Sequence, residues 1–243
     1  MRDYSDHGDR RSAERDVSIT AVETAVIEGN FDWNLIRIHT DAGPVGIGEA
    51  YRGGRVTDIV EYMASFLVGE NPLDVERLFR RMIQETSGHG GTTGKVVTAA
   101  SGVEIALWDV AGKLLSVPTY QLLGGKYRDE VRLYADLHAG EAYAVDTGYT
   151  DYGASEAYRP EAYAESAREA VDLGFDAIKF DLDTPADNHP DPVNGRLSAS
   201  DVADKREVVA AVHDAVGDEV EIAFDAHWDY SKDSAKRLAR ALE

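Results

Sequence analysis

A regular alternation of strand-like and helix-like segments in the second half of the sequence is the feature that most limits the possible folds. From Val131 onward, short apolar runs alternate with segments of helical period, and the alternation occurs three times. A strand–helix–strand order of this kind predicts a parallel sheet with right-handed crossovers. The expected strands are 131–138, 176–182 and 219–227, and the expected helices are 160–174, 198–217 and 231–243.

The first half of the sequence has a different order, with strands first and helices after them. Residues 1–16 are polar and aperiodic, and we expect them to form a mobile leader. The segments that follow predict an antiparallel three-stranded meander and then three helices, which is the α+β order. The strands are expected at 17–28, 33–40 and 45–50. The first helix is expected at 56–69 and the third at 95–116. The second helix is expected to be capped by Asn71, with Pro72 at its first helical position. The domains are therefore expected at 17–130 and 131–243.

Three β/α units are too few to close a barrel, which needs eight. The last predicted helix keeps its apolar period up to Glu243 without a stop signal. We therefore expect the sequence to be the front portion of a longer protein, the alternative being a small three-stranded layer with bare edges. In an open sheet we expect four apolar side chains to be partly uncovered, namely Ile178, Phe180, Ile222 and Phe224.

Ionisable residues gather where two of the predicted parallel strands end. Alternate strand residues share a face, so Lys179 and Asp181 point the same way, as do Asp225 and His227. The carboxyl ends of barrel strands are where active sites lie. Each residue alone has a structural alternative, because a strand-end aspartate often caps a turn and a single histidine is usually structural. Their occurrence together favours a functional site.

The composition excludes several classes of protein. Cysteine is absent, which excludes a disulfide framework and a thiolate metal site. The net charge is −20 with no basic cluster, which argues against nucleic acid or an anionic membrane as partner. No stretch is long and apolar enough for a membrane span, and we expect a cytoplasmic protein. The dispersed acidity is typical of proteins from salt-loving organisms, the alternative being an ordinary acidic cytosolic protein.

Four segments give the sequence its resemblance to a known family. They are GPVGIGEA at 43–50, the block AASGVEIALWDVAGKLLSVPTYQLLGG at 99–125, GFDAIKFD at 174–181 and EIAFDAHWDY at 221–230. In this order they resemble the enolase superfamily, in its mandelate racemase/muconate lactonizing branch. The resemblance implies an α+β capping domain followed by a modified (β/α) TIM-type barrel. It also implies that loops near 28–33 and 51–56 shield the substrate, with Trp33, Tyr51 and Arg55 as substrate-binding residues.

The same resemblance implies abstraction of a proton next to a carboxylate, with Mg²⁺ stabilising the resulting enediolate. Asp225 corresponds to the first metal ligand and Lys179 to the first lysine of the family's Lys-x-Lys pair. Asp181 replaces the second lysine, which makes a two-base racemase doubtful and leaves Asp181 a catalytic or substrate-orienting role. The pair Asp225 and His227 is similar to that of acid sugar dehydratases, in which the histidine protonates the leaving 3-hydroxyl. We expect the remaining metal ligands and the base to lie beyond Glu243.

The resulting hypothesis is a Mg²⁺-dependent dehydratase that converts an aldonic acid, such as gluconate, xylonate or galactonate, to a 2-keto-3-deoxy acid. A racemase or cycloisomerase of the same branch is the enzymatic alternative, and a catalytically incomplete fragment is the other. The expected partner is a small sugar acid. A homo-oligomer is expected for the whole protein.

Overall fold

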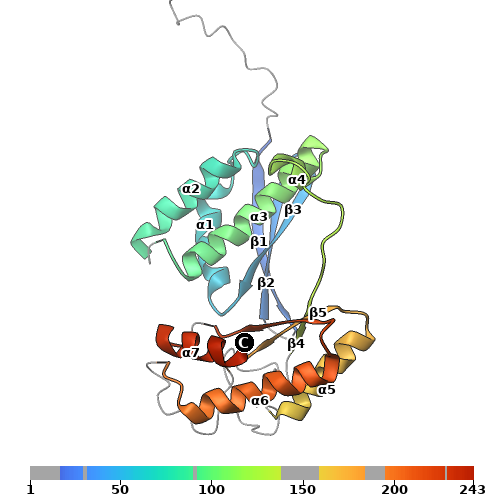
Figure 1. The fold of residues 1–243 in the computed structure, drawn as a ribbon. Coiled ribbons are helices and arrows are strands. Elements are labelled where there is room, and N and C mark those ends of the chain that lie inside the picture. Colours follow the sequence, from blue (N-terminus) through green and yellow to red (C-terminus); the bar gives the residue numbers. More distant parts are fainter. Residues whose placement is uncertain (1–16, 30–31, 90–91, 138–158, 184–194, 228) are drawn as a thin grey trace, which may run out of the picture. The chain divides into compact units, whose positions relative to one another are not determined.

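The computed structural model describes residues 17–29, 32–89, 92–137, 159–183, 195–227 and 229–243. The expected leader, 1–16, lies outside the described residues. The chain divides into two compact units, residues 1–129 and 130–243, one residue away from the expected boundary (Figure 1). Among the described helices, none combines the length and the apolar character needed to cross a membrane.

The N-terminal unit begins with the expected antiparallel meander. Strand β1 (Ile19–Glu28) pairs with β2 (Asp32–Thr40), which pairs with β3 (Val45–Arg52). Every second residue of β2 is buried, from Asn34 to Thr40, because one face of the sheet is covered by helices. The three strands of the meander were therefore predicted correctly from the sequence, and the structure adds which face of β2 is buried.

Helices α1 (Val56–Leu67), α2 (Val75–Thr86) and α3 (Lys95–Leu115) follow, with a 3₁₀ turn η1 (Ser87–His89) and the short α4 (Thr119–Leu122). The expected start of α2 at Pro72 is wrong by three residues. Asn71 Oδ1 accepts a hydrogen bond from Leu73 N at 2.9 Å, so this side chain closes a turn of its own. The helix begins only after Asp74, whose carbonyl accepts from Leu78 N.

Glycines let α3 lie directly against β3. A Cβ atom on Gly48 would lie 2.1 Å from the carbonyl oxygen of Gly102, and one on Gly102 would lie 2.5 Å from the Cβ of Ala50. Both distances are far below van der Waals contact, so the close approach of helix and strand requires residues without a side chain. The core of this unit is built on that contact, with Ile36, Met63, Leu78 and Leu107 fully buried around it.

The C-terminal unit is the expected parallel sheet. Its strands β4 (Ala135–Leu137), β5 (Ala177–Asp181) and β6 (Glu221–Asp225) lie in the order β4-β5-β6, and α5 (Pro160–Asp172), α6 (Ala199–Val216) and α7 (Lys232–Leu242) alternate with them (Figure 1). The first strand is shorter than expected, since residues 131–134 are exposed and irregular. The cause is the register: Ala135 pairs with Ile178, the second residue of β5, so residues 131–133 come before the start of that strand.

The two faces of this sheet differ in polarity. Ile178 and Phe180 pack beneath the helices, against Tyr163 and Val212, and are fully buried. The expectation that these two side chains are uncovered is therefore wrong, because they face the helix layer. Phe224 fits the expectation, with 39% of its surface exposed.

Helix α6 has the predicted start and stop. Ser198 Oγ accepts from Asp201 N at 3.1 Å, and Asp201 Oδ2 accepts from Ser198 N at 2.5 Å, and together these two bonds form a capping box. Gly217 ends the helix at φ 76°, a left-handed conformation that favours glycine. These local signals required no knowledge of the tertiary structure.

The contact between α3 and β3 gives a stability prediction. We expect Gly48→Ala to lower the free energy of unfolding of the N-terminal unit by about 1–3 kcal/mol or more, because the added methyl group meets backbone atoms that cannot move aside. The measurement is urea denaturation of the natural gene product that contains this chain. Gly88→Ala is the matched control, since a Cβ there has no atom within 4 Å. Equal stability of the two variants would contradict the close packing.

Candidate active site

The carboxyl ends of the three parallel strands meet at one edge of the C-terminal sheet. Asp136 of β4 lies beside Lys179 of β5, and Lys179 lies beside Ala223 of β6. Two residues along, Asp181 lies beside Asp225. The register therefore places an ammonium and three carboxylates within two residues of each other along neighbouring strands.

Lys179 sits between two of these carboxylates. Its Nζ lies 3.3 Å from Asp136 Oδ1 and 3.7 Å from Asp225 Oδ2, and 5.5 Å from the centre of the Tyr134 ring. Partial burial disfavours the charged form, but the hydrogen bond and charge of Asp136, with Tyr134 and Asp225, raise the pKa of Lys179 above its ordinary value. Lys179 is thus an ammonium at neutral pH. Asp136 is the charged partner that an ammonium group in an otherwise apolar strand requires.

Asp136 was missed by the reasoning from sequence. Its position in the sequence could have revealed it, because Asp136 is the polar residue of the segment Ala135–Leu137, on the first of three strands that were expected to be parallel. Asp136 lies opposite Lys179 because Ala135 and Leu137 pair with Ile178 and Phe180, and a strand of three residues is too short a pattern to predict that pairing from the sequence.

Asp225 is an ionised carboxylate with one oxygen held by the backbone. Its Oδ1 accepts from Ala226 N at 2.7 Å and from His227 N at 3.3 Å. The hydrogen bonds from His227 and Ala226 lower the pKa of Asp225 below its ordinary value, assisted by the charges of His227 and Lys179. The other oxygen, Oδ2, is the one nearer the Lys179 ammonium.

His227 leaves the end of β6 in a left-handed backbone conformation, with φ 37°. Its Nδ1 lies 2.8 Å from Asp183 Oδ2 and 3.9 Å from Asp181 Oδ1. Burial lowers the stability of the imidazolium, but the hydrogen bond and charge of Asp183, with the charges of Asp181 and Asp225, raise the pKa of His227 above its ordinary value. The structure thus brings together the predicted residues Asp181 and His227, and adds Asp183.

Asp183 is the second residue that the sequence did not reveal. Its side chain is only 12% exposed, and desolvation raises the pKa of its carboxyl group despite the hydrogen bond from His227. Asp181, Asp183 and His227 each offer one ligand atom, and these atoms lie within 4.8 Å of one another. This group of three residues could hold a metal ion. It does not include Asp225, the metal ligand that the resemblance implied.

In the N-terminal unit, the structure brings two of the predicted substrate-binding residues together. Trp33 and Tyr51 form an edge-to-face pair with ring centres 6.2 Å apart. Asn34, which is buried, donates from Nδ2 to the carbonyl oxygens of Tyr51 at 3.0 Å and Gly53 at 3.3 Å. The side chain of Asn34 therefore anchors the segment that follows β3.

The same segment contains two residues in an unusual backbone conformation. Tyr51 has φ 50° and Arg55 has φ 68°, and neither is glycine. Such residues cost free energy and are retained where the surrounding structure holds them, often at functional sites. Lys95 Nζ donates to Gly54 O at 2.7 Å, which ties the segment to the start of α3.

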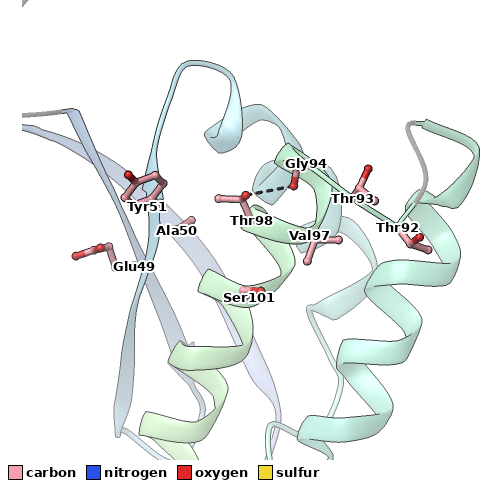
Figure 2. A pocket seen from close by; sticks show the side chains of 9 residues that line it. All are labelled: Glu49, Ala50, Tyr51, Thr92, Thr93, Gly94, Val97, Thr98 and Ser101. Carbon is pink, nitrogen blue, oxygen red and sulfur yellow. Dashed lines mark hydrogen bonds between the residues drawn. The ribbon is translucent and has the colours of Figure 1, made fainter. Parts of the chain in front are cut away.

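A cavity of about 400 Å³ lies between the end of β3 and the start of α3 (Figure 2). Glu49 and Tyr51 line it on the strand side, and Thr93, Thr98 and Ser101 line it on the other side. At the start of α3, Thr98 Oγ1 donates to Gly94 O at 3.2 Å, as Figure 2 shows. Of the residues that line the cavity, the sequence indicated only Tyr51 as a candidate site residue.

A parallel β/α unit with ionisable residues at the carboxyl edge of its strands, combined with an α+β unit, defines a class of proteins in which a barrel-type catalytic domain is accompanied by a capping domain. Two family models match the chain. The model described as mandelate racemase / muconate lactonizing enzyme, N-terminal domain, matches residues 12–124, and the model described as enolase C-terminal domain-like matches residues 162–243. The chain belongs to the mandelate racemase/muconate lactonizing group of the enolase superfamily.

Similar proteins support this assignment. D-xylonate dehydratase of Haloferax volcanii is 50% identical over 100% of this chain and 57% of its own length. D-gluconate dehydratase of Thermoproteus tenax is 32% identical over 86% of this chain and 38% of its own length. The crystal structure of a mandelate racemase/muconate lactonizing enzyme-like protein from Rubrobacter xylanophilus is 42% identical, covers 93% of this chain and 58% of its own, and superposes with a TM-score of 0.82. The expected fold class is thereby confirmed, and the chain spans about 57% of the length of the Haloferax relative.

The contact between Lys179 and Asp136 gives a testable prediction. Asp136→Asn removes the charge that most strongly favours the ammonium, so we expect the pKa of Lys179 to fall. The measurement is an NMR titration of the gene product with ¹³C-labelled lysine. Asp176→Asn is the control, because Asp176 pairs with Arg132 and is not among the groups that shift the pKa of Lys179. An unchanged Lys179 titration in Asp136→Asn would show that the contact is not formed.

Proposed function

We propose that the protein is a Mg²⁺-dependent dehydratase of an aldonic acid, which forms a 2-keto-3-deoxy acid. The observation that carries this proposal is the pairing of an ionised carboxylate, Asp225, with an imidazole two residues later whose Nδ1 is already hydrogen-bonded. That arrangement supplies a cation ligand and a proton donor at one strand end. The similar proteins from Haloferax and Thermoproteus are named as dehydratases of D-xylonate and D-gluconate, which are both aldonic acids.

The described residues supply one of the ligands that a Mg²⁺ ion needs in the proposed site. Asp225 is a hard anionic oxygen donor with its charge stabilised by backbone amides, which is the ligand type that Mg²⁺ prefers. When bound, the ion supplies positive charge that stabilises the substrate carboxylate as the neighbouring proton is removed. An octahedral cation needs further oxygen ligands, and we expect them from acidic residues at later strand ends and from the substrate.

In the proposed reaction, Lys179 and Asp181 both act on the substrate. Lys179 neutralises the substrate carboxylate, since its raised pKa keeps it an ammonium and excludes it as a base near neutral pH. Asp181 accepts hydrogen bonds from substrate hydroxyls and so orients the acid against His227. The base that removes the α-proton is expected outside the described residues.

His227 is the general acid of the proposed reaction. The electron pair left at the α-carbon forms a double bond to the β-carbon, the bond from that carbon to its hydroxyl breaks, and Nε2 of His227 gives its proton to the departing oxygen. Water leaves, and the enol that remains becomes the 2-keto-3-deoxy acid. The raised pKa of His227 favours the protonated ring that this step needs near neutral pH.

Trp33, Tyr51 and Arg55 contact the substrate on this proposal. The support for it lies in their own unit: Trp33 and Tyr51 form an edge-to-face pair, Asn34 holds the carbonyl group of Tyr51, and Tyr51 and Arg55 both have a strained backbone. Aromatic rings bind the C–H faces of a polyol, and a guanidinium binds its hydroxyls or carboxylate.

We propose a cytoplasmic setting at high salt and a homo-oligomeric gene product. The net charge of −20 favours a medium in which repulsion between carboxylates is screened, and the 50% identical relative comes from Haloferax volcanii. The proposed substrate, a small polar acid, is compatible with the cytoplasmic setting. Neither nucleic acid nor a membrane is proposed as a partner.

The function is tested by incubating the natural gene product with Mg²⁺ and D-xylonate, D-gluconate or D-galactonate, and by measuring the 2-keto-3-deoxy product. We expect product from at least one of these acids. Inversion of a substrate's α-carbon without loss of water would favour a racemase. Absence of either reaction, with Mg²⁺ bound, would contradict an enzymatic role for this site.

Substitution of the proposed metal ligand gives the first prediction about catalysis. Asp225→Asn in the gene product should abolish the Mg²⁺-dependent activity with little effect on the fold, because a neutral amide is a poor substitute for an anionic oxygen. Asp176→Asn, immediately before β5, should keep full activity. Normal turnover of Asp225→Asn at saturating Mg²⁺ would refute the assignment of the ligand.

Substitution of the proposed acid separates the two halves of the reaction. His227→Asn should reduce formation of the keto-deoxy acid by about 10²- to 10⁴-fold, because the amide cannot deliver a proton to the leaving hydroxyl. Exchange of the α-hydrogen with deuterated solvent should persist, since that step depends on other groups. Undiminished dehydration by this variant would leave His227 with a structural or orienting role only.

A further inference from the structure

The imidazole of His227 is oriented by a contact from outside its own strand. Its backbone is in the left-handed region, at φ 37°, so β6 has ended and its pleat no longer directs the side chain. The ring contact at hydrogen-bond distance is with Asp183, at 2.8 Å, whereas Asp181 Oδ1 is too distant at 3.9 Å. Asp183 lies two residues beyond the end of β5, so the contact joins the ends of two neighbouring strands.

The backbone immediately before Asp183 is held from three sides. The carbonyl oxygen of Leu182 accepts hydrogen bonds from Lys205 Nζ of α6 and from the hydroxyl group of Tyr230. The amide of Leu182 donates to Asp225 O at 2.9 Å. Lys205 is only 5% exposed, and its Nζ lies 5.6 Å from the centre of the Tyr230 ring. The aspartate that contacts His227 therefore follows a peptide with little freedom to move.

A carboxylate can only accept a hydrogen bond, so the ring nitrogen that faces it carries the hydrogen. We propose that Asp183 is the positioning residue of the general acid: it holds His227 with Nδ1–H donating to Oδ2 and directs Nε2 to the substrate. This inference rests on the proposed function, in which Nε2 gives its proton to the departing hydroxyl. After that transfer the ring is neutral, and the hydrogen that remains is the one on Nδ1, which is still bonded to Asp183. The same contact therefore fits the ring before and after the proton leaves.

A second use of the same side chains is a metal site formed by Asp181, Asp183 and His227. A cation bound to Nδ1 displaces the hydrogen that Asp183 accepts, so the two uses exclude each other. The observed geometry favours the direct hydrogen bond, because one carboxylate is at bonding distance from Nδ1 while the other is not.

The most direct test is the tautomer of His227 in the wild-type gene product. With ¹⁵N-labelled histidine, at a pH at which the ring is neutral, we expect NMR to show the hydrogen of His227 on Nδ1. Asp183→Asn should reduce this population, and Asp218→Asn is the matched control. Asp218 Oδ1 lies 2.9 Å from Nε2 of a different imidazole, His213, so this variant should change the signals of His213 and leave those of His227 as they are.

A wild-type ring that carries its hydrogen on Nε2 would overturn the proposal without any variant. An unchanged Nδ1–H population in folded Asp183→Asn would overturn it as well, as would displacement of that hydrogen by Mg²⁺ or Zn²⁺ at stoichiometric concentration. These readouts need no substrate, so they are independent of whether the gene product dehydrates a sugar acid.

Kinetics then test whether the contact matters for the proposed reaction. Asp183→Asn should lower kcat for dehydration by about 10- to 100-fold with little change in KM, and should spare α-hydrogen exchange. In the His227→Asn background the same substitution should cost nothing further, because a positioning residue acts only through the group it positions. Additive losses in the double variant would show that Asp183 acts by another route and would contradict the proposal.

Discussion

The parallel pairing of β4, β5 and β6 is the constraint on which the candidate site depends. Parallel strands end at a common edge, and the register places Asp136, Lys179 and Ala223 in one row and Asp181 with Asp225 two residues further along. A shift of one residue would turn Lys179 into the apolar layer that Ile178 and Phe180 occupy. The hydrophobic packing beneath the helices therefore fixes the register, and the register creates the site.

Each ionisable side chain at this edge has a partner of opposite or complementary character. The ammonium of Lys179 lies between carboxylates, and the imidazole of His227 donates to Asp183. These partners keep Lys179 charged, Asp225 ionised and His227 basic, which are the states that the proposed reaction needs. The structural stability of the edge and its chemistry thus come from the same contacts.

The sequence predicted the elements and the polar strand ends, but not the contacts that adjust them. Period and capping signals specified the meander, the parallel unit and the start of α6 at Ser198. Lys179 and Asp225 were found because alternation in a strand is a local property. Asp136 and Asp183 were not found, because their importance depends on register and on the path of the chain after the strand ends. The start of α2 was misplaced since Asn71 closes a turn with Leu73, which competes with a helix cap.

In the proposed reaction, the carboxyl edge of these strands binds the catalytic cation. The most direct measurement is paramagnetic broadening by Mn²⁺, which takes the same oxygen ligands as Mg²⁺, in the gene product with ¹³C-labelled alanine methyl groups. The methyl signals of Ala223 and Ala226, which flank Asp225 on both sides, should broaden at low Mn²⁺, and Mg²⁺ should reverse the effect. The signal of Ala203, exposed on α6, should persist. Equal broadening of all three signals, or none at saturating Mn²⁺, would contradict a cation site at this edge.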